Sequence, residues 1–305
     1  MTVTELPAAR DLFSTAGLPE ARRVELWEDH NATALIGLTC RTDGGALDAA
    51  ELTVRLGDLQ LARVTASAHA VARTPEVIRA SPADAIAVYV TVRGAASFEH
   101  DGGTLPLRPG HVLMYDADRP FTRGFAHGLE ELAVRVPRAA FPAGTLRRPV
   151  VADAVRGQHA RALAGLLDRA TRPTRPVAAD ERTVLELVTL LSGSDGDPAT
   201  AHRAAARAFI EANLADHGLT AALVAAAVGI SERQLSRVFA ADGTTVPKYV
   251  LTRRLHLAYA LLSGGDLPVA DVAGRCGFAS TTYFSHVFRG RFGVRAGDVR
   301  RAEKY

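Results

Sequence analysis

The residues best suited to chemistry form an arginine-rich group near the C-terminus. Arg233, Ser236 and Arg237 fall at helical spacing, and Leu235 and Phe239 take positions between and after them. Side chains three and four residues apart share one face of a helix, so this segment has a polar face and an apolar face. Because arginine can bond bidentately to O6 and N7 of guanine, the polar face has the chemistry needed to read base edges in DNA.

A second copy of the same arrangement follows 48 to 49 residues later. Each copy has a short apolar helix, a glycine suited to a turn with positive φ, a serine that can cap the next helix, and a second amphipathic helix. These are the parts of a helix-turn-helix unit, so we predict two such units. The repeated residues are Val224, Ala225, Gly229, Ile230, Ser231, Leu235 and Phe239, then Val272, Ala273, Gly277, Phe278, Ser280, Phe284 and Phe288.

The outer face and the first turn of each second helix supply the candidate contacts with DNA. Arginine and threonine side chains can contact base edges, and the free backbone amides at a helix N-terminus can bind phosphate. The predicted DNA-binding residues are Ser231, Arg233, Gln234, Ser236, Arg237, Ser280, Thr281, Thr282, Ser285, His286 and Arg289.

A long amphipathic helix is predicted between the two copies. Pro247 suits its first turn, Leu255, Tyr259 and Leu262 share one side, and Gly264 suits its end. Such a helix would hold the two units at a fixed separation. If both second helices face one side of a duplex, they enter successive major grooves roughly 34 Å apart, which predicts a long, non-palindromic site for each monomer.

The distribution of charge agrees with a polyanion-binding C-terminus. The chain has 36 Lys and Arg residues against 33 Asp and Glu residues. From Ala201 onward there are 14 basic and 8 acidic residues, a net charge of +6, which leaves 22 basic and 25 acidic residues, or −3, for positions 1–200. A basic module joined to a mildly acidic one is typical of a nucleic-acid binder with a separate second function.

The first 150 residues read mostly as strands after a helix near Pro19–His30. Leu52, Val54 and Leu56 alternate with polar residues, while 85–92 and 129–136 resemble buried strands. Closely spaced turn signals between them predict a small antiparallel barrel or sandwich. Helices are predicted over 153–169 and 177–191, separated by the proline-rich stretch 171–176 and followed by a linker-like stretch at 193–198.

The C-terminal hundred residues resemble the AraC/XylS transcription regulators. The matching residues are Arg233, Leu235, Arg237, Phe239, Gly243, Tyr249, Arg254, Leu255, Ala258, Leu261, Leu262, Ala273, Gly277, Phe278, Ser280, Tyr283, Phe284, Ser285, Phe288, Arg291, Phe292, Gly293 and Arg300. The resemblance implies that Arg233, Ser236 and Arg237 read one major groove and that Thr281, Thr282 and His286 read the next. This chain has Ala296 where the family usually has proline, and His286 where it often has arginine.

The N-terminal region is similar, more loosely, to the cupin-like effector domain of that family. The similarity rests on Arg73, Thr74, Gly94, Leu107, Arg108, Pro109, Gly110, Met114, Tyr115, Asp116, Pro120, Phe121, Val136, Pro137 and Arg138. It implies a small-molecule effector in the barrel, a homodimer formed through the following helices, and contact with RNA polymerase in the role of an activator. The effector-binding residues are unknown from the sequence, and Arg73 is the one weak candidate, as a partner for an anionic effector.

The expected fold is α+β with two domains. A cupin-like antiparallel barrel occupies residues 1–150, an α-hairpin 151–192, a linker 193–200, and an all-α domain with two helix-turn-helix units 201–305. Cys40 and Cys276 form no disulfide framework. Neither a signal peptide nor a membrane span is indicated, so we expect the protein in the cytoplasm without a membrane partner.

Two rival functions stay open at this stage. One is a cupin-type metalloenzyme fused to a DNA-binding domain, with His69, His100, His111, His127 and Glu130 as possible ligands, although no tight ligand spacing links them. The other is a constitutive DNA-binding regulator with no effector. No nucleophile elbow or phosphate-binding loop is present, so we expect no enzyme activity, no cofactor and no metal.

Overall fold

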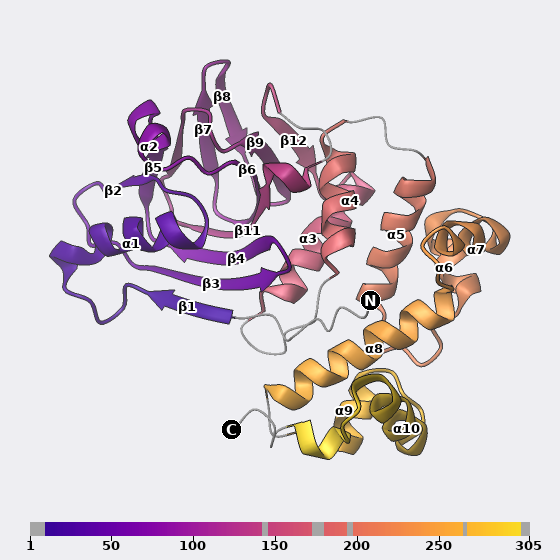
Figure 1. The fold of residues 1–305 in the computed structure, drawn as a ribbon. Helices are drawn as coiled ribbons and strands as arrows, with labels where there is room; N and C mark the ends of the chain where they lie inside the picture. Colours follow the sequence, from indigo (N-terminus) through magenta and orange to yellow (C-terminus); the bar gives the residue numbers. More distant parts are fainter. Residues whose placement is uncertain (1–9, 142–145, 173–179, 194–197, 265–266, 300–305) are drawn as a thin grey trace. The chain divides into compact units, whose positions relative to one another are not determined.

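The protein divides into two compact units. The computed structural model describes residues 10–141, 146–172, 180–193, 198–264 and 267–299. Of these, residues 10–171 and 184–193 belong to an N-terminal unit, and residues 172, 180–183 and 198–299 belong to a C-terminal unit. Figure 1 shows strands throughout the first unit and only helices in the second.

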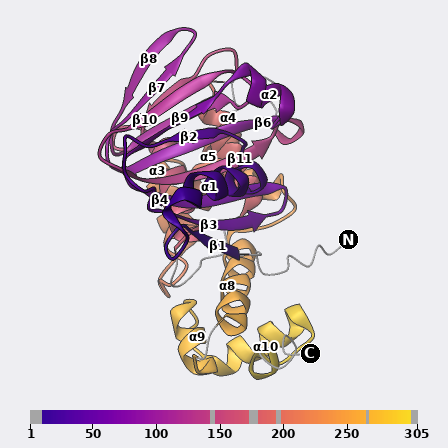
Figure 2. The same ribbon diagram turned by 90° about the vertical axis from the view of Figure 1, so that its left-hand side faces the viewer.

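Two antiparallel sheets form the body of the N-terminal unit, and Figure 2 labels strands of both sheets. The seven-stranded sheet has the order β1 (Arg10–Ser14), β3 (Ala49–Leu56), β4 (Leu59–Ala66), β11 (Leu129–Pro137), β6 (Ala85–Arg93), β9 (His111–Asp116) and β12 (Val150–Asp153). The five-stranded sheet has the order β2 (Thr39–Arg41), β5 (His69–Arg73), β10 (Phe121–Phe125), β7 (Ala96–His100) and β8 (Gly103–Leu107). This architecture confirms the predicted antiparallel domain.

The central strands explain why the sequence forms this sheet. β6 pairs with both β11 and β9, and its first seven residues are all buried, as expected for a strand covered on both faces. The predicted buried strands at 85–92 and 129–136 are therefore confirmed. One apolar cluster fills the space between the inner faces of the two sheets, and Trp27 of α1 (Glu20–Ala34) joins it.

The alternating residues 52–56 form the second half of β3, so the strand that they predicted is confirmed. Leu52 and Leu56 are only partly buried, and Val54 is the buried member of the three apolar residues that alternate in the sequence. Glu51 is 0% exposed and faces the interior. Pairing with β1 and β4 decides which side faces inward, and this pairing is not visible in the local pattern.

The predicted hairpin and linker need correction at their boundaries. Residues 150–153 form β12, paired with β9, so the first helix of the hairpin begins at Gln158 rather than Asp153. The helices are α3 (Gln158–Ala170) and α4 (Glu181–Leu191). α5 (Pro198–Ala212) begins inside the predicted linker, because proline suits the first turn of a helix. Residues 173–179 and 194–197 lie outside the described part of the chain.

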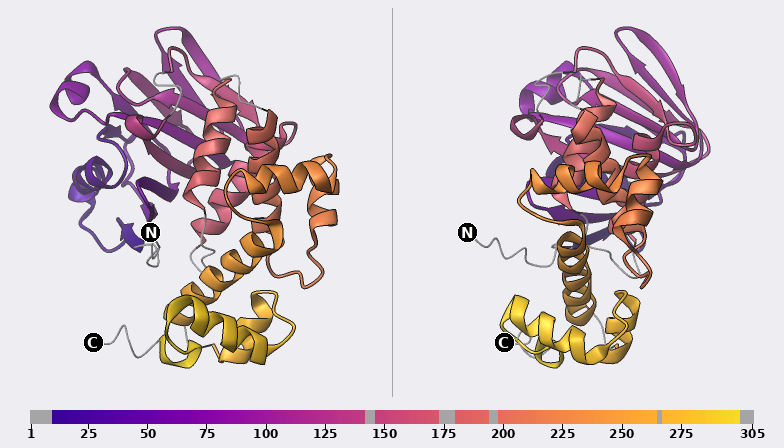
Figure 3. Two further views of the ribbon diagram at one scale, coloured as in Figure 1. Left: turned by 45° about the vertical axis from the view of Figure 1, so that its right-hand side comes forward. Right: turned by 90° about the vertical axis from the view of Figure 1, so that its right-hand side faces the viewer.

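The C-terminal unit is helical throughout its described residues. The elements are α5, α6 (Ala221–Val228), α7 (Glu232–Ala240), α8 (Val246–Ser263), α9 (Val269–Arg275), α10 (Thr281–Phe292) and the 3₁₀ turn η2 (Ala296–Asp298). A short helix α2 (Pro75–Ala80) and a 3₁₀ turn η1 (Arg138–Ala140) belong to the N-terminal unit. Both views of Figure 3 show α9 and α10 gathered at the end of α8. The predicted fold class, with a long helix joining two helix-turn-helix units, is confirmed.

Buried ion pairs join α5 to the helices that follow it. Arg253 Nε of α8 donates to Glu211 Oε1 of α5 at 2.5 Å, and both side chains are almost fully buried. Arg207 Nη2 donates to Asp242 Oδ2, in the turn after α7, at 2.6 Å. α5 therefore braces the first helix-turn-helix unit against α8. No described helix has the length and apolar character needed to cross a membrane.

Candidate nucleic-acid interface

Each predicted turn contains a glycine in the left-handed region. Gly229 has φ +77° and Gly277 has φ +80°, as the sequence predicted. A side chain at either position would be strained, because the Cβ of an L-residue meets the following carbonyl oxygen there. The turns let α7 and α10 leave α6 and α9 at a fixed angle.

The predicted serine caps are also present. Ser231 Oγ accepts a hydrogen bond from the Gln234 amide, and the Gln234 side chain accepts from the Ser231 amide, which makes a complete capping box. Ser280 Oγ accepts from the Tyr283 amide at 3.3 Å. The caps fix where α7 and α10 begin, and so they fix which residues occupy the outer face of each helix.

The two faces of α7 are separated as the spacing predicted. Leu235 and Phe239 are 0% exposed and lie in the core of the C-terminal unit. Arg233 and Arg237 are exposed on the opposite side, and neither forms an ion pair with a described residue. Their positive charges are therefore available to an external anion.

α10 has the same construction with a less basic outer face. Phe284 and Phe288 are fully buried, and Phe288 packs between Phe284 and Phe292. Thr282, His286 and the other predicted contacts of this helix are exposed. A face of hydroxyl, imidazole and one guanidinium group can contact bases through hydrogen bonds and methyl groups.

All the predicted DNA-binding residues lie on the surface of the C-terminal unit. They comprise Ser231, Arg233, Gln234, Ser236 and Arg237 from the first copy, and Ser280, Thr281, Thr282, Ser285, His286 and Arg289 from the second. Lys248, Arg275 and Arg295 are further exposed basic side chains of this unit, outside the residues predicted from the sequence. Their position beside the two units, within the basic C-terminal segment, was the available signal.

The second helix-turn-helix unit packs closely against α8 and the residues that follow α5. Arg254 of α8 donates to the backbone oxygens of Leu214 and Asp216, which follow α5. The backbone of Gly277 fits against the same place, since a Cβ on it would lie 2.3 Å from Leu214 O and 2.7 Å from Arg254 Nε. This close packing makes the two helix-turn-helix units parts of one core.

Comparison with known families assigns both units. Residues 224–302 match a family model described as a helix-turn-helix domain. Residues 27–220, more than half of the chain, match one described as an AraC-binding-like domain. The chain belongs to the AraC/XylS family of transcription regulators. It is a sequence-specific DNA-binding regulator, as the repeated units predicted.

Individual relatives match either most of this chain or about a third of it. The transcriptional activator NphR of a Rhodococcus species is 29% identical over 264 residues, which are 80% of this chain and 78% of NphR. The transcriptional activator RhrA of Rhizobium meliloti (strain 1021) is 39% identical over 94 residues, 30% of each chain. The AraC-like activator CuxR has a similar fold, with a TM-score of 0.50 and 22% identity over 83% of this chain and 96% of CuxR.

In this AraC/XylS regulator, the Arg73 side chain is fully buried and hydrogen-bonded to the protein. Its guanidinium donates to Ala117 O at 2.6 Å, to Gly37 O at 2.5 Å, and to Ser81 O and Asp118 Oδ1 at 2.8 and 3.0 Å. Four of its five N–H donors are thus bonded to protein. The effector role predicted for Arg73 stays untested, and its bonding favours a structural role.

The histidines considered as metal ligands are dispersed. His69 lies on β5 with its ring stacked on Phe125, and burial lowers its pKa. His100 ends β7, where its Nδ1 lies 3.1 Å from Asp101 Oδ1, and His111 begins β9. The described part of the chain contains no group of three or more His, Cys, Asp or Glu side chains that could hold a metal ion.

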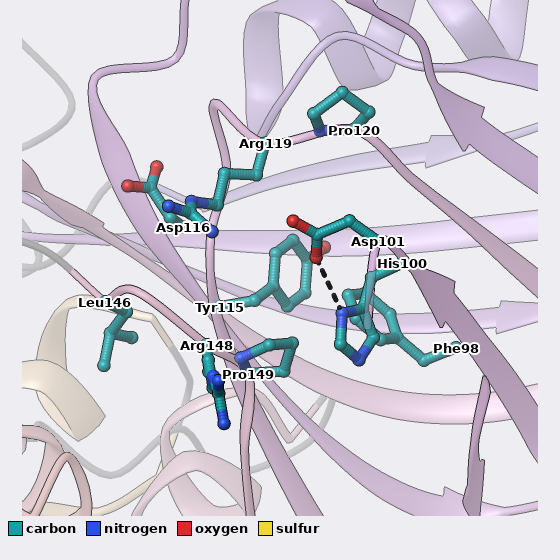
Figure 4. A pocket seen from close by; sticks show the side chains of 10 residues that line it. All are labelled: Phe98, His100, Asp101, Tyr115, Asp116, Arg119, Pro120, Leu146, Arg148 and Pro149. Atoms are coloured by element: carbon teal, nitrogen blue, oxygen red, sulfur yellow. Dashed lines mark hydrogen bonds and ion pairs between the residues drawn. The ribbon is translucent and has the colours of Figure 1, made fainter. Parts of the chain in front are cut away.

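A small pocket opens beside β7 and β9 of the N-terminal unit (Figure 4). Its volume of about 20 Å³ has room for about one water molecule. The lining residues are Phe98, His100, Asp101, Tyr115, Asp116, Arg119, Pro120, Leu146, Arg148 and Pro149. Figure 4 shows Tyr115 behind the His100–Asp101 pair. Tyr115 thus lines the pocket and also belongs to the apolar cluster between the sheets.

Proposed function

We propose that this regulator activates transcription by placing α7 and α10 of one monomer in successive major grooves of a promoter. The observation that supports this most directly is the pair of exposed polar faces, each set by a capped helix and a glycine turn, on a single packed core. In this proposal Arg233, Ser236 and Arg237 read one groove. Thr281, Thr282 and His286 read the next.

The exposed basic residues beside the two units would contact the DNA backbone. Lys248, Arg275 and Arg295 are exposed, and their charges can neutralise phosphates. Such contacts fix the register of a protein on a duplex without selecting its sequence. The amides at the start of α7 and α10 that are not used by the serine caps can serve the same purpose.

A small-molecule effector would act through the N-terminal unit. The match to an AraC-binding-like domain supports a ligand-binding role for this part of the chain. An effector changes the outcome only through its different affinities for two states of the protein. We therefore expect DNA binding or transcription to respond to one class of small molecule, and an indifferent response would favour a constitutive regulator.

A homodimer and a contact with RNA polymerase complete the proposal, and both rest on membership of the family. The leucines of α3 are already buried within the chain, as are Val184, Leu187 and Val188 of α4. A dimer would therefore use the outward sides of these helices rather than their apolar stripes. Analytical ultracentrifugation of the full chain tests this: a monomer at micromolar concentration would contradict it.

The DNA proposal is tested by selecting sites from a pool of random duplexes with the purified full-length protein. We expect a motif with two conserved blocks separated by roughly one helical turn, about 10 base pairs. A single short block would mean that only one unit reads sequence. Absence of any enriched motif would contradict sequence-specific binding altogether.

A further inference from the structure

A row of side chains inside the N-terminal unit contains two buried carboxylates. The strand register places Phe13, Glu51, Val64, Glu131 and Thr91 side by side across β1, β3, β4, β11 and β6. Glu51 is 0% and Glu131 is 2% exposed. Because neighbouring strands lie about 4.8 Å apart, the two glutamate backbones are roughly 10 Å from each other. Both carboxylates thus belong to one compact interior.

Glu131 is hydrogen-bonded to a counter-ion, whereas Glu51 has only the His30 ring at ion-pair distance. Arg123 Nη2, from β10 of the other sheet, donates to Glu131 Oε1 at 2.5 Å. Neither carboxylate oxygen of Glu51 has a hydrogen-bond partner among the described residues. His30 Nε2 lies 3.7 Å from Glu51 Oε1, which is too far for a hydrogen bond. A buried carboxylate without donors is costly, so its presence calls for an explanation.

An aromatic pair lies beside Glu51. The His30 ring stacks on Phe13 with centroids 4.3 Å apart, so an aromatic pair borders the carboxylate. Burial raises the pKa of the Tyr89 phenol, and the carboxylates of Glu131 and Glu51 add to the rise while Arg123 opposes it. Glu51, Glu131, Tyr89 and Arg123 therefore share one electrostatic environment.

We infer that the interior of the N-terminal unit binds a small organic cation, a protonated amine on an aliphatic or aromatic body, with its ammonium group on Glu51. When the His30 ring is uncharged, two carboxylates and one guanidinium leave a net charge of −1, which one ammonium neutralises. Its three N–H donors can satisfy both oxygens of Glu51, and aromatic faces nearby favour a cation. This inference rests on the proposed function, because it names the chemical class of the effector.

The donor set favours an ammonium group over a metal ion. The described residues bring no third His, Cys, Asp or Glu side chain close enough to complete a metal site around Glu51 and His30. Arg123 Nε also has no hydrogen-bond partner in the described part of the chain, so it can serve an oxygen acceptor on the same ligand.

The pocket of Figure 4 is the side from which we expect the ligand to enter. Tyr115 lines that pocket, and its ring centroid lies 5.9 Å from that of Tyr89. The Arg123 guanidinium lies 4.3 Å from the centre of the Tyr89 ring. A chain of three side chains therefore joins the surface to the Arg123–Glu131 pair. The small volume of the pocket means that binding must widen it.

The test uses thermal unfolding of the full-length protein with matched amines and carboxylates. The probes are butylamine, benzylamine and phenethylamine, each compared with the carboxylic acid of the same body, at about pH 8, where an ordinary histidine is neutral. The variants are Glu51→Gln and, as a control, Glu25→Gln, which removes an exposed carboxylate paired with Arg22.

Two results are expected together. At least one amine raises the Tm of the wild type and of Glu25→Gln, its carboxylate counterpart does not, and Glu51→Gln lowers the amine affinity by about tenfold or more. Without ligand, Glu51→Gln has a Tm equal to or above that of the wild type, because an uncompensated buried charge has been removed.

The opposite results overturn the inference. If Glu51→Gln unfolds at a lower temperature or fails to fold, Glu51 is a structural partner of His30. If no amine shifts the Tm, or if the carboxylates shift it equally, the interior is not an ammonium site. DNA binding by the same preparations is a separate readout. If the wild-type protein binds no DNA site, the proposed function is contradicted and the amine site is not.

Discussion

Arg237 is the residue on which base reading by the first unit can be tested alone. It is exposed on α7, it makes no ion pair with a described residue, and its backbone position is fixed by the capping box. Arg237→Ala should weaken binding to the selected site by about 1–3 kcal/mol and relax the preference at one base pair. Fluorescence anisotropy measures the change.

The control for Arg237→Ala is Arg22→Ala, which removes an exposed arginine from the N-terminal unit. It changes the net charge of the protein equally but should leave affinity and base preference unchanged. Equal effects of the two substitutions would mean that Arg237 acts through net charge alone.

His256 provides a pH-dependent test of packing in the C-terminal unit. Burial is the largest cause, and the nearby charges of Arg253 and Arg291 add to it, so that together they lower the pKa of His256 from 6.5 to about 4. The folded protein therefore binds this proton less readily than the unfolded chain. The stability associated with the neutral ring is complete above about pH 6.5 and declines as the pH falls towards 4.

Urea denaturation across this pH range should show a loss on the order of 1–2 kcal/mol that His256→Gln lacks, a reduced value because solvent reaches part of the ring. His286→Gln, at an exposed histidine of the same unit, serves as the control and should retain the wild-type decline. An identical decline in the His256 variant would show that another group is responsible.

At the level of single residues, the sequence predicted what local spacing determines. The faces of α7 and α10, the two serine caps and the two positive-φ glycines follow from patterns within a few residues, and the structure has them. Glu51 could not be found in this way. Its burial depends on pairing with β1 and β4, and the row that it forms with Glu131 joins strands about 80 residues apart.

At the level of elements, the two turns require glycine for different structural reasons. Gly229 is in the left-handed region with open space around its Cβ position, whereas the Cβ position of Gly277 collides with Leu214 O and Arg254. Gly229→Ala should cost about 1 kcal/mol through backbone strain alone.

Gly277→Ala should cost about 1–3 kcal/mol more than Gly229→Ala, because a backbone oxygen cannot move aside. Chemical denaturation of the two variants measures the difference directly. Equal losses of stability would contradict the close packing of Gly277, in the second helix-turn-helix unit, against Leu214 and Arg254.

The boundaries of elements were the weakest part of the sequence prediction. Residues 150–153 were expected at the start of a helical hairpin, but they extend the seven-stranded sheet beside β9. The helical pattern of α3 begins only after Gly157, its N-cap residue. Strand addition at a sheet edge depends on a partner distant in sequence, and local periodicity does not reveal it.

At the level of the whole molecule, the uneven charge predicts a strong salt dependence. The basic C-terminal segment carries a net charge of +6, and several of its exposed basic residues lie on or beside α7 and α10. Each phosphate contact contributes about −0.9 to the slope of log affinity against log salt concentration, so several contacts give a steep decline. Affinity that stays constant as salt is raised would contradict an interface dominated by the DNA backbone.

We propose that one chain reads DNA with two separate helices, and a comparison of two variants on the selected site distinguishes this from reading by a single helix. Arg237→Ala and Thr282→Ala are each measured against a set of duplexes with one base pair changed at a time. Arg237→Ala should lose its preference only in one block of the site and Thr282→Ala only in the other, about one helical turn away. Loss of preference at the same positions in both variants would contradict it.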